Sequence, residues 1–410
     1  MIANCPIKTA KFNYDSIFEA RIEELKREGR YRYFLDVNKS AQHFPKFFYA
    51  DQRGDKKSAI NWCSNDYLCM SVHEEVISKL SYAAHRSGAG SSGTRNISGT
   101  TNFHRELENT LAELHEKESA LLFNGAYLAN LTAISTLGKI LPNCAILSDE
   151  RNHASIIEGV KASGCEKFVF HHNDLGHLQQ ILAQVEISRP KIIVFESVYS
   201  MNGNISPIAE IVKLAKQYNA LTYIDEVHAV GLYGERGAGL ASTLAVKDQV
   251  DVINGTLAKG YGVIGGYIAA KQSIIDTVRS FGSGFIFTTS LPPAVCSAAN
   301  RSIQILMTDK TIRPRYWEKV LEFRAFLNEN GIKFLPNHSH ITSVPIGDSQ
   351  RCKKISDRLL KEFEIYIQPI NYPTVQRGEE CLRITLTMRH ETRDMFYLAK
   401  SLKTVLNESA

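Results

Sequence analysis

The sequence predicts an α/β fold with a mainly parallel seven-stranded sheet in a large domain, followed by a smaller C-terminal α+β domain. Short apolar runs alternate with helix-length segments through the middle of the chain, which is typical of parallel strands joined by crossover helices. A Gly/Pro break, GSGFIFTTSLPP, ends this pattern. The tail beyond it has three further strand candidates, ITSVPIG, IYIQPI and CLRITLT.

The chain begins with one expected helix and an arm. Apolar positions recur at helical spacing through residues 13–34, and the helical part ends near Gly29. We assign the N-terminal helix and arm to residues 1–58, the large domain to 59–304 and the small domain to 305–410. The strands of the large domain are expected in seven runs: ALLF near 120, CAILS near 144, KFVF near 167, KIIVFES near 191, ALTYIDE near 220, DVINGT near 251 and GGYIAA near 265.

Composition excludes several classes of protein. The 410 residues carry a formal charge of +5 without a long basic run, so nucleic acid is not an expected partner. No apolar run has the length of a membrane span, and the opening stretch MIANCPIKTAKFNYDS lacks the apolar core of a signal peptide. We therefore expect a cytoplasmic protein with no membrane partner. The eight cysteines form no C-x-x-C pair, which predicts reduced thiols and no metal site.

A lysine in a turn gives the first indication of chemistry. Lys259 follows an expected strand in DVINGTLAKGYG, among small residues that leave room for a bulky group. A lysine becomes reactive when the pKa of its ammonium is lowered or its nitrogen is held as an imine. Thr256, three residues earlier, offers a hydroxyl group to a phosphate. The pattern favours a pyridoxal phosphate site, against the commoner alternative of a solvated loop lysine.

An acid and a histidine follow the preceding strand. In ALTYIDEVHAVG, Asp225 ends an apolar run and His228 comes three residues later. Pyridoxal phosphate needs an acid beside its pyridine nitrogen, because the protonated ring is the better electron acceptor. Ligands of parallel sheets bind beyond the carboxyl ends of the strands, so we expect Asp225, His228 and Lys259 to share one pocket.

Two more segments fit this pocket. In LFNGAYLAN, Gly125, Ala126 and Tyr127 lie between a strand and a helix, where free backbone N–H groups bind phosphate; a plain tight turn explains them equally well. In SDERNHASIIEG, His153 lies near a helix start and is placed to stack on a flat ring. The alternative is a surface or capping histidine.

Eight blocks of the chain resemble the α-oxoamine synthases, which are pyridoxal phosphate enzymes of the fold-type I aminotransferase class. They are EGRYR, WCSNDYL, GTRNISGTT, NHASIIEG, FESVYSMNG, YIDEVHAVGLYG, GFIFTTSLPP and IYIQPINYPTV. The resemblance extends over nearly the whole chain and is closest to the 5-aminolevulinate synthases. It implies a decarboxylating condensation of glycine with succinyl-CoA to 5-aminolevulinate, coenzyme A and CO2, as the first step of the C4 route to haem, by a homodimer with shared active sites.

The resemblance also implies roles for the cofactor residues. Lys259 would bind the cofactor covalently and then act as the base, and Asp225 would pair with the pyridine nitrogen. His228 would hydrogen-bond the 3-oxygen of the ring, and His153 would stack on the ring. The other implied cofactor contacts are Gly125, Ala126, Tyr127, Ser200 and Thr256, with Thr288 and Thr289 supplied by the neighbouring subunit.

On the substrate side, the resemblance implies that Asn65 and Arg383 hold the glycine carboxylate, the arginine by a forked pair of hydrogen bonds. The other implied substrate contacts are Arg32, Thr94, Asn96 and Thr374 at the succinyl end, and Ser148 and Lys167 on the coenzyme A side. Without the resemblance, Arg32 and Lys167 would be interpreted as a helix-end cation and a surface residue at a strand entry.

Five positions depart from the usual family pattern. We expect the exchange of glycine and alanine around Lys259 to be tolerated if neither residue needs a positive φ. Loss of prolines after Arg383 is expected to loosen a lid near the substrate. The departing residues are Ser92 in GSSGTRN, Ala258 and Gly260 in GTLAKG, Leu386 in LRITLTM, and Cys69 where glycine is expected after NDYL.

Two other functions remain open from the sequence. One is another α-oxoamine synthase that uses a different acyl-CoA or amino acid, and the other is a catalytically silent relative that binds pyridoxal phosphate. Arg32 favours a short dicarboxylic acyl group, because a long alkyl chain would leave a buried cation unpaired.

A cysteine near the N-terminus suggests regulation. Cys5 precedes proline in NCPIK, and a Cys-Pro pair can ligate haem iron. Haem feedback through Cys5 is a minor hypothesis, because a terminal Cys-Pro is usually without function.

Overall fold

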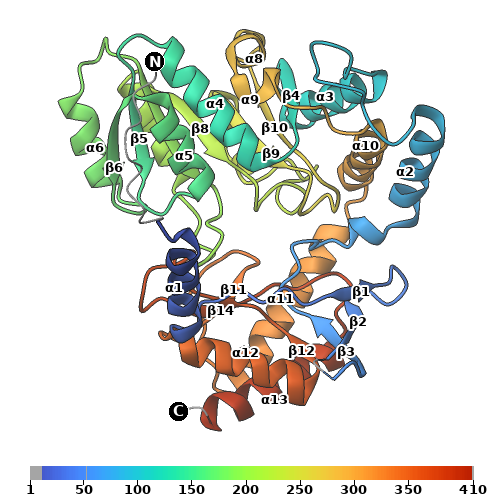
Figure 1. Cartoon of the computed structure of the whole chain (residues 1–410). Helices are drawn as coiled ribbons and strands as arrows, with labels where there is room; N and C mark the ends of the chain where they lie inside the picture. Colours follow the sequence, from blue (N-terminus) through green and yellow to red (C-terminus); the bar gives the residue numbers. More distant parts are fainter. Residues whose placement is uncertain (1–11, 52, 409–410) are drawn as a thin grey trace, which may run out of the picture.

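The computed structural model describes residues 12–51 and 53–408 and shows an upper and a lower lobe (Figure 1). Cys5, the residue of the haem hypothesis, lies outside the described residues. The upper lobe contains a seven-stranded sheet in the order β4-β10-β9-β8-β7-β5-β6. Only β10 runs antiparallel to its neighbours, so the predicted mainly parallel sheet is confirmed. Its strands are β4 (Ser119–Phe123), β5 (Ala145–Asp149), β6 (Glu166–Phe170), β7 (Lys191–Glu196), β8 (Leu221–Asp225), β9 (Val252–Thr256) and β10 (Gly266–Ala270).

Helices cover both faces of this sheet because its strands are apolar on both sides. Successive side chains of a strand point to opposite faces. Ile146 of β5 accordingly packs in one core cluster with Ile134 and Ile156, whereas Leu147 packs in another with Leu178 and Ile211. The first cluster includes residues of α4 (Ala126–Ile140), α5 (Ala154–Ser163), α8 (Gln272–Phe281) and α9 (Ser283–Ile286), and the second includes residues of α6 (Leu175–Gln184) and α7 (Ile208–Gln217). Short 3-10 turns follow at η2 (Ala241–Thr243) and η3 (Lys247–Gln249).

A third cluster joins the two lobes. It contains Leu107 and Ile303 from the upper part of the molecule and Phe323 and Leu398 from the lower part. In Figure 1 the chain passes from α10, beside α2 and α3 in the upper lobe, into α11, which runs down into the lower lobe. The shared apolar core fixes the orientation of the two lobes. The helices of this cluster are α2 (Glu74–Ser87), α3 (Asn102–His115), α10 (Pro293–Thr308), α11 (Ile312–Glu329), α12 (Ser349–Phe363) and α13 (Thr392–Glu408), with the turn η1 (Met70–Val72).

The lower lobe combines both ends of the chain in two small sheets. In the first, β3 pairs with β12 in parallel, with Ile60 opposite Ile365. The strand β3 crosses the expected boundary at residue 58, and residues on both sides of that boundary belong to one sheet. The first sheet has the order β1-β2-β3-β12 and the second β11-β14-β13, made of β1 (Val37–Lys39), β2 (Lys46–Ala50), β3 (Lys56–Asn61), β11 (Thr342–Pro345), β12 (Ile365–Tyr366), β13 (Pro369–Ile370) and β14 (Cys381–Ile384).

The predicted N-terminal helix is present as α1 (Tyr14–Arg27). The side chain of Asn13 caps it by accepting a hydrogen bond from the backbone N–H of Ser16. Gly29, with a φ of 70°, follows its end. None of the helices in the described part of the chain is both long and apolar enough to cross a lipid bilayer.

Candidate active site

Three predicted residues meet at the carboxyl ends of β8 and β9. Asp225 is the last residue of β8, His228 lies in the turn after it, and Lys259 lies in the turn after β9. The amine nitrogen Nζ of Lys259 is 3.0 Å from Nε2 of His228. The structure therefore places the lysine in the pocket and not in bulk solvent.

The amino group of Lys259 is biased towards its neutral form. Burial lowers the pKa of Lys259 to about 8, and the charge of Arg383 acts in the same direction against the opposing effect of Asp225. Burial, with the charge of Lys259 as the next cause, also holds the pKa of His228 well below its usual value. A neutral imidazole beside an amine whose pKa is lowered towards neutrality suits a nucleophile or base.

Arg383 connects the lower lobe to this pocket. It lies on β14 and is 6% exposed. Its Nη1 and Nη2 donate to Oδ1 of Asn65 and to the hydroxyl group of Tyr67, both at 3.2 Å, and its Nε donates to the carbonyl of Ser200 at 2.6 Å. The prediction that Asn65, Ser200 and Arg383 lie together agrees with this geometry. Among the described residues, no carboxylate forms an ion pair with this guanidinium.

Tyr67 and Asn130 are functional candidates that the sequence interpretation missed. The hydroxyl group of Tyr67 is 3.0 Å from Nδ1 of His228 and so links that histidine to Arg383. Nδ2 of Asn130 donates to Oδ2 of Asp225 at 2.6 Å, and the backbone N–H of Val227 donates to Oδ1 at 2.8 Å. Asn130 is a buried polar residue in a mostly apolar helix, and that pattern could have revealed it.

His153 caps the start of α5 at the edge of the same pocket. Its Nδ1 accepts from the backbone N–H of Ser155 at 3.2 Å, and its own backbone N–H donates to Glu196 at 2.6 Å. Its ring lies 6.2 Å from that of Tyr127, at 82°. Burial lowers the pKa of His153, which leaves the ring in the uncharged form suited to stacking. The capping alternative is therefore confirmed, and stacking on a flat ring stays a prediction.

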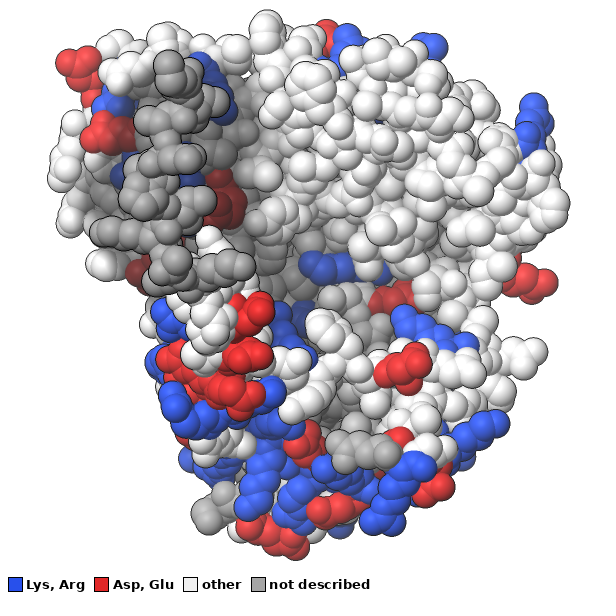
Figure 2. Space-filling model, in the orientation of Figure 1, with Lys and Arg blue, Asp and Glu red and all other residues white. Residues whose placement is uncertain are grey.

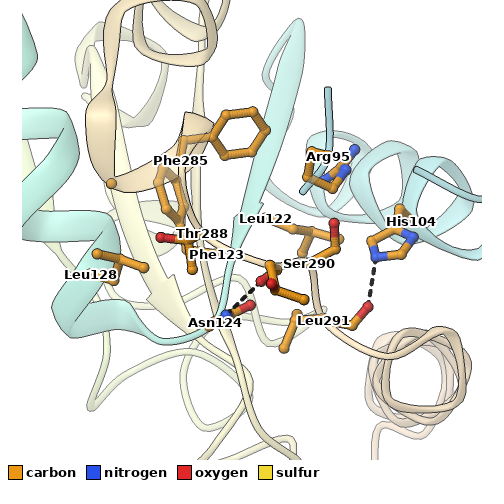
Figure 3. Close-up of a pocket in the computed structure, with 12 residues that line it drawn as sticks. Arg95, His104, Leu122, Phe123, Asn124, Leu128, Phe285, Thr288, Ser290 and Leu291 are labelled. Atoms are coloured by element: carbon orange, nitrogen blue, oxygen red, sulfur yellow. Dashed lines mark hydrogen bonds between the residues drawn. The ribbon is translucent and has the colours of Figure 1, made fainter. Parts of the chain in front are cut away.

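The expected phosphate turn lies at the start of α4. Gly125 precedes the helix and Ala126 is its first residue, so their N–H groups are at the helix N-terminus. Thr256 fixes the next turn, because its hydroxyl group donates to the carbonyl of Gly265 and accepts from the N–H of Ala258, both at 3.1 Å. Figure 3 shows the segment around Thr288 passing beside the end of β4, where Nδ2 of Asn124 donates to the carbonyl of Thr289 at 2.8 Å.

The predicted acyl residues form two separate pairs. Nη2 of Arg32 donates to the hydroxyl group of Thr374 at 3.1 Å, and both line a cavity of about 810 Å³. The hydroxyl group of Thr94 donates to Oδ1 of Asn96 at 2.8 Å, and Asn96 lines a different cavity. Their role in binding the acyl group stays a prediction. The expectation of a buried cation is wrong for the single chain, because Arg32 is exposed there.

The two coenzyme A candidates differ in position. Ser148 is buried near the end of β5 and accepts from Nδ2 of Asn152 at 2.9 Å. Lys167 is exposed on the edge strand β6, opposite Ile146 and three residues before the end of that strand. Ser148 therefore lies at the carboxyl edge where the site forms, whereas Lys167 lies back from that edge.

Comparisons with known proteins fit this geometry. Residues 57–402 match the family of class I and II aminotransferases. A 5-aminolevulinate synthase from Bradyrhizobium diazoefficiens is 48% identical over 96% of this chain and 96% of its own, and one from Rickettsia bellii is 49% identical over 92% and 90%. The chain belongs to the 5-aminolevulinate synthase family. A structure of a serine palmitoyltransferase with PLP has a TM-score of 0.89 and 27% identity, covering 97% of this chain and 99% of that one.

Two departures from the family pattern fall at left-handed backbone positions. Ser92 has a φ of 67° and Cys69 a φ of 59°, and these are positions where the resemblance leads us to expect glycine. A side chain at such a position costs roughly 1 kcal/mol or more. The chain therefore carries local strain on two loops that glycine would relieve.

The structure corrects the expectation that glycine and alanine can be exchanged freely around Lys259. Neither Ala258 nor Gly260 has a positive φ, which was the stated condition for exchange. A Cβ atom at Gly260 would nevertheless lie 2.4 Å from the carbonyl oxygen of Val230. Alanine at position 260 would therefore require a backbone shift, because its Cβ atom would lie too close to this oxygen. The backbone dihedral angles alone would allow alanine.

The segment after Arg383 is held firmly without prolines. The backbone N–H of Met388 donates to the carbonyl of Tyr67 at 2.9 Å, a bond that proline could not make, and that of Thr385 donates to Trp62 at 2.8 Å. The hydroxyl group of Tyr316 donates to the carbonyl of Leu386 at 3.3 Å. The expected loosening is therefore offset by hydrogen bonds.

We expect Lys259 of the cofactor-free protein to titrate near pH 8. Its pKa is lowered by burial, so the amine is protonated and unreactive below that pH and neutral above it. The acylation rate of Lys259 should rise through pH 8 and then level off, as measured by peptide mass spectrometry with exposed Lys213 as the comparison. A midpoint at the free-lysine value of about 10.4 would contradict the buried environment.

Proposed function

We propose that this chain condenses glycine with succinyl-CoA to give 5-aminolevulinate, coenzyme A and CO2. The observation that carries the proposal is one pocket with three groups: a lysine amine with a lowered pKa, an aspartate held by neutral donors, and an arginine without a carboxylate partner. These groups suit an amino-acid substrate held beside a carbonyl cofactor. Curated relatives of this family carry the same activity in their names.

The residues present fit pyridoxal phosphate. Asp225 is placed to keep a proton on the ring nitrogen, since its two donors favour its ionised form. His228 would hydrogen-bond the 3-oxygen, His153 would stack on the ring, and the turn at Gly125 and Ala126 would bind the phosphate, with the side chains of Tyr127, Ser200 and Thr256 around it. When bound, the cofactor supplies an electron-withdrawing ring that stabilises negative charge on the glycine α-carbon.

The amino acid is bound and activated by three side chains. Arg383 holds the glycine carboxylate with its forked guanidinium, and Asn65 lies beside it. Lys259 removes a proton from the α-carbon with Nζ, the atom that lies 3.0 Å from Nε2 of His228 in the structure. Because Arg383 fixes the carboxylate and Lys259 takes the proton, the α-carbon is oriented for attack on the thioester.

The acyl group is bound at its far carboxylate. Arg32 and Thr374 are linked at 3.1 Å and offer charge and a hydroxyl group to the succinyl end, and Ser148 and Lys167 contact the coenzyme A part. The α-carbon of glycine forms a bond to the thioester carbon, and coenzyme A leaves. The original glycine carboxyl group then departs as CO2, the ammonium of Lys259 returns a proton to the α-carbon, and 5-aminolevulinate is released.

We also propose a homodimer with shared active sites. Arg32 and Thr374 line one cavity of the chain and Asn96 lines another, so a single acyl group that touches both sets needs a second copy. Ile97 and Phe287, beside Thr94–Asn96 and Thr288 in the sequence, are each 80% exposed. Figure 2 shows few charged side chains on the visible face of the upper lobe, which favours burial against a partner.

The dimer predicts a solution mass of twice 45.9 kDa. Replacing Ile97 and Phe287 by aspartate should lower that mass, because buried carboxylates without partners oppose association. Light scattering after size-exclusion chromatography measures both. A wild-type protein that remains at 45.9 kDa at micromolar concentration would contradict the shared site.

The condensation predicts one product from one acyl donor. Mass spectrometry of a reaction with glycine and succinyl-CoA should show 5-aminolevulinate, and octanoyl-CoA should be poorly used because it leaves Arg32 unpaired. The Lys259→Ala variant should form no product. Comparable rates with octanoyl-CoA would indicate a different synthase, and no product with any acyl donor would favour a silent cofactor-binding relative.

Replacement of the forked cation tests glycine binding. Arg383→Lys should raise KM for glycine by about tenfold to a hundredfold, because a point charge cannot replace two charged hydrogen bonds. Steady-state kinetics against glycine and against succinyl-CoA separates this effect from a general loss. The control is Arg389→Lys, at an exposed position of the segment that follows β14. An equal rise in KM for both substrates would argue against the assigned role.

A further inference from the structure

We propose that Glu196 is a positioning residue of the cofactor pocket, which as a neutral carboxylic acid holds the backbone of His153 and leaves Asp225 as the ionised carboxylate. The inference rests on the proposed cofactor site and adds a residue to it. Glu196 is the last residue of β7, is 3% exposed, and has no place in the mechanism above.

The sheet places two carboxyl groups side by side. β7 and β8 are parallel neighbours, and Glu196 is the register partner of Asp225. Register partners on adjacent strands point to the same face, about 4.8 Å apart at the backbone. Two buried carboxylates at that separation cannot both be ionised without a large cost, so one of the pair keeps its proton.

The hydrogen bonds decide which carboxyl group is ionised. Asp225 accepts from the Asn130 amide and from the N–H of Val227, so both of its oxygens are stabilised as a carboxylate. Glu196 accepts one hydrogen bond, from the N–H of His153 at 2.6 Å. Asp225 has the stronger set of donors, and the proton therefore stays on Glu196.

The other charged groups around Glu196 do not reverse this. Burial, with the charges of Asp225 and Asp149, holds the pKa of Glu196 well above its usual value, while the N–H of His153 and the charge of Lys259 oppose them. Asp149 has its own donors at the N–H groups of Arg151 and Asn173 and at His172. The further titratable group that interacts with Glu196 is Tyr199, whose own pKa burial raises well above its usual value.

The contact to His153 gives Glu196 its positioning role. His153 is the N-cap residue of α5. Ser155 holds its ring at Nδ1, and Glu196 holds its backbone N–H. Loss of the acceptor oxygen would free the first turn of α5. The ring would then lose the orientation that the proposed stacking needs.

The holoenzyme tests both parts of the proposal. Burial raises the pKa of Glu226 to about 7, so Glu226 also contributes to the C=O band of protonated carboxyl groups at neutral pH. The infrared difference between wild type and Glu196→Gln should therefore show the loss of one such band, whereas Glu158→Gln, at an exposed site on α5, should show no loss. Visible circular dichroism reports how the bound cofactor is held. Glu196→Gln keeps the acceptor oxygen and should keep the cofactor band, whereas Glu196→Ala should lose most of its amplitude or invert its sign.

Two results would overturn the proposal. They are an infrared difference spectrum in which Glu196→Gln loses no carboxyl band, or an equal loss of the cofactor signal in the glutamine and alanine variants. If Glu196→Ala does not fold, the infrared difference for Glu196→Gln alone decides the protonation state. No measurement uses glycine or succinyl-CoA, so failure here is distinct from failure of the proposed condensation.

Discussion

The hydroxyl group of Tyr67 joins the two lobes at the pocket. It is in contact with His228 of the upper lobe and with Arg383 on β14 of the lower lobe. Both partners are buried, and a buried polar group left without a partner costs about 1–3 kcal/mol. The lobes must therefore meet in one arrangement to satisfy all three groups, and that arrangement brings the guanidinium to the lysine amine.

The charges of the pocket are arranged so that ligands can use them. Asp225 is stabilised by an amide and a backbone N–H rather than by a cation, so its charge is not neutralised within the protein. Arg383 donates to a carbonyl, an amide and a hydroxyl group. Because each charged group has neutral partners, each keeps its orientation and most of its electrostatic attraction for a bound group of opposite charge.

The sequence was sufficient for the large sheet and for three pocket residues. Apolar runs identify strands, and the edge rule for parallel sheets places Asp225, His228 and Lys259 together. The sequence was not sufficient for Asn130, which is 95 positions from Asp225 and meets it only because α4 packs on the sheet. Tyr67 lies in WCSNDYL, one of the blocks that resemble the family, but its contact with Arg383 depends on β14 of the lower lobe.

The lower lobe shows a second limit of sequence patterns. β3 and β12 are about 300 residues apart and pair in parallel, and neither run carries information about the other. A strand of two to six residues has too little hydrophobic periodicity to indicate its place in a sheet, so its position depends on the strand with which it pairs. The expected boundary at residue 58 lies where the local sequence pattern changes, whereas the sheet is formed by strands from both ends of the chain.

The isolated bridge between Thr94 and Thr289 joins, within one chain, two segments that we propose to serve the active site of the partner. Thr94 belongs to the pair proposed for the acyl carboxylate, and Thr289 to the pair proposed for the cofactor phosphate. Asn124 fixes the backbone of Thr289 from the end of β4. In a dimer, each subunit would therefore present acyl and phosphate contacts to its partner as one unit, so cofactor seating and acyl recognition in a given site depend on the same neighbouring loop.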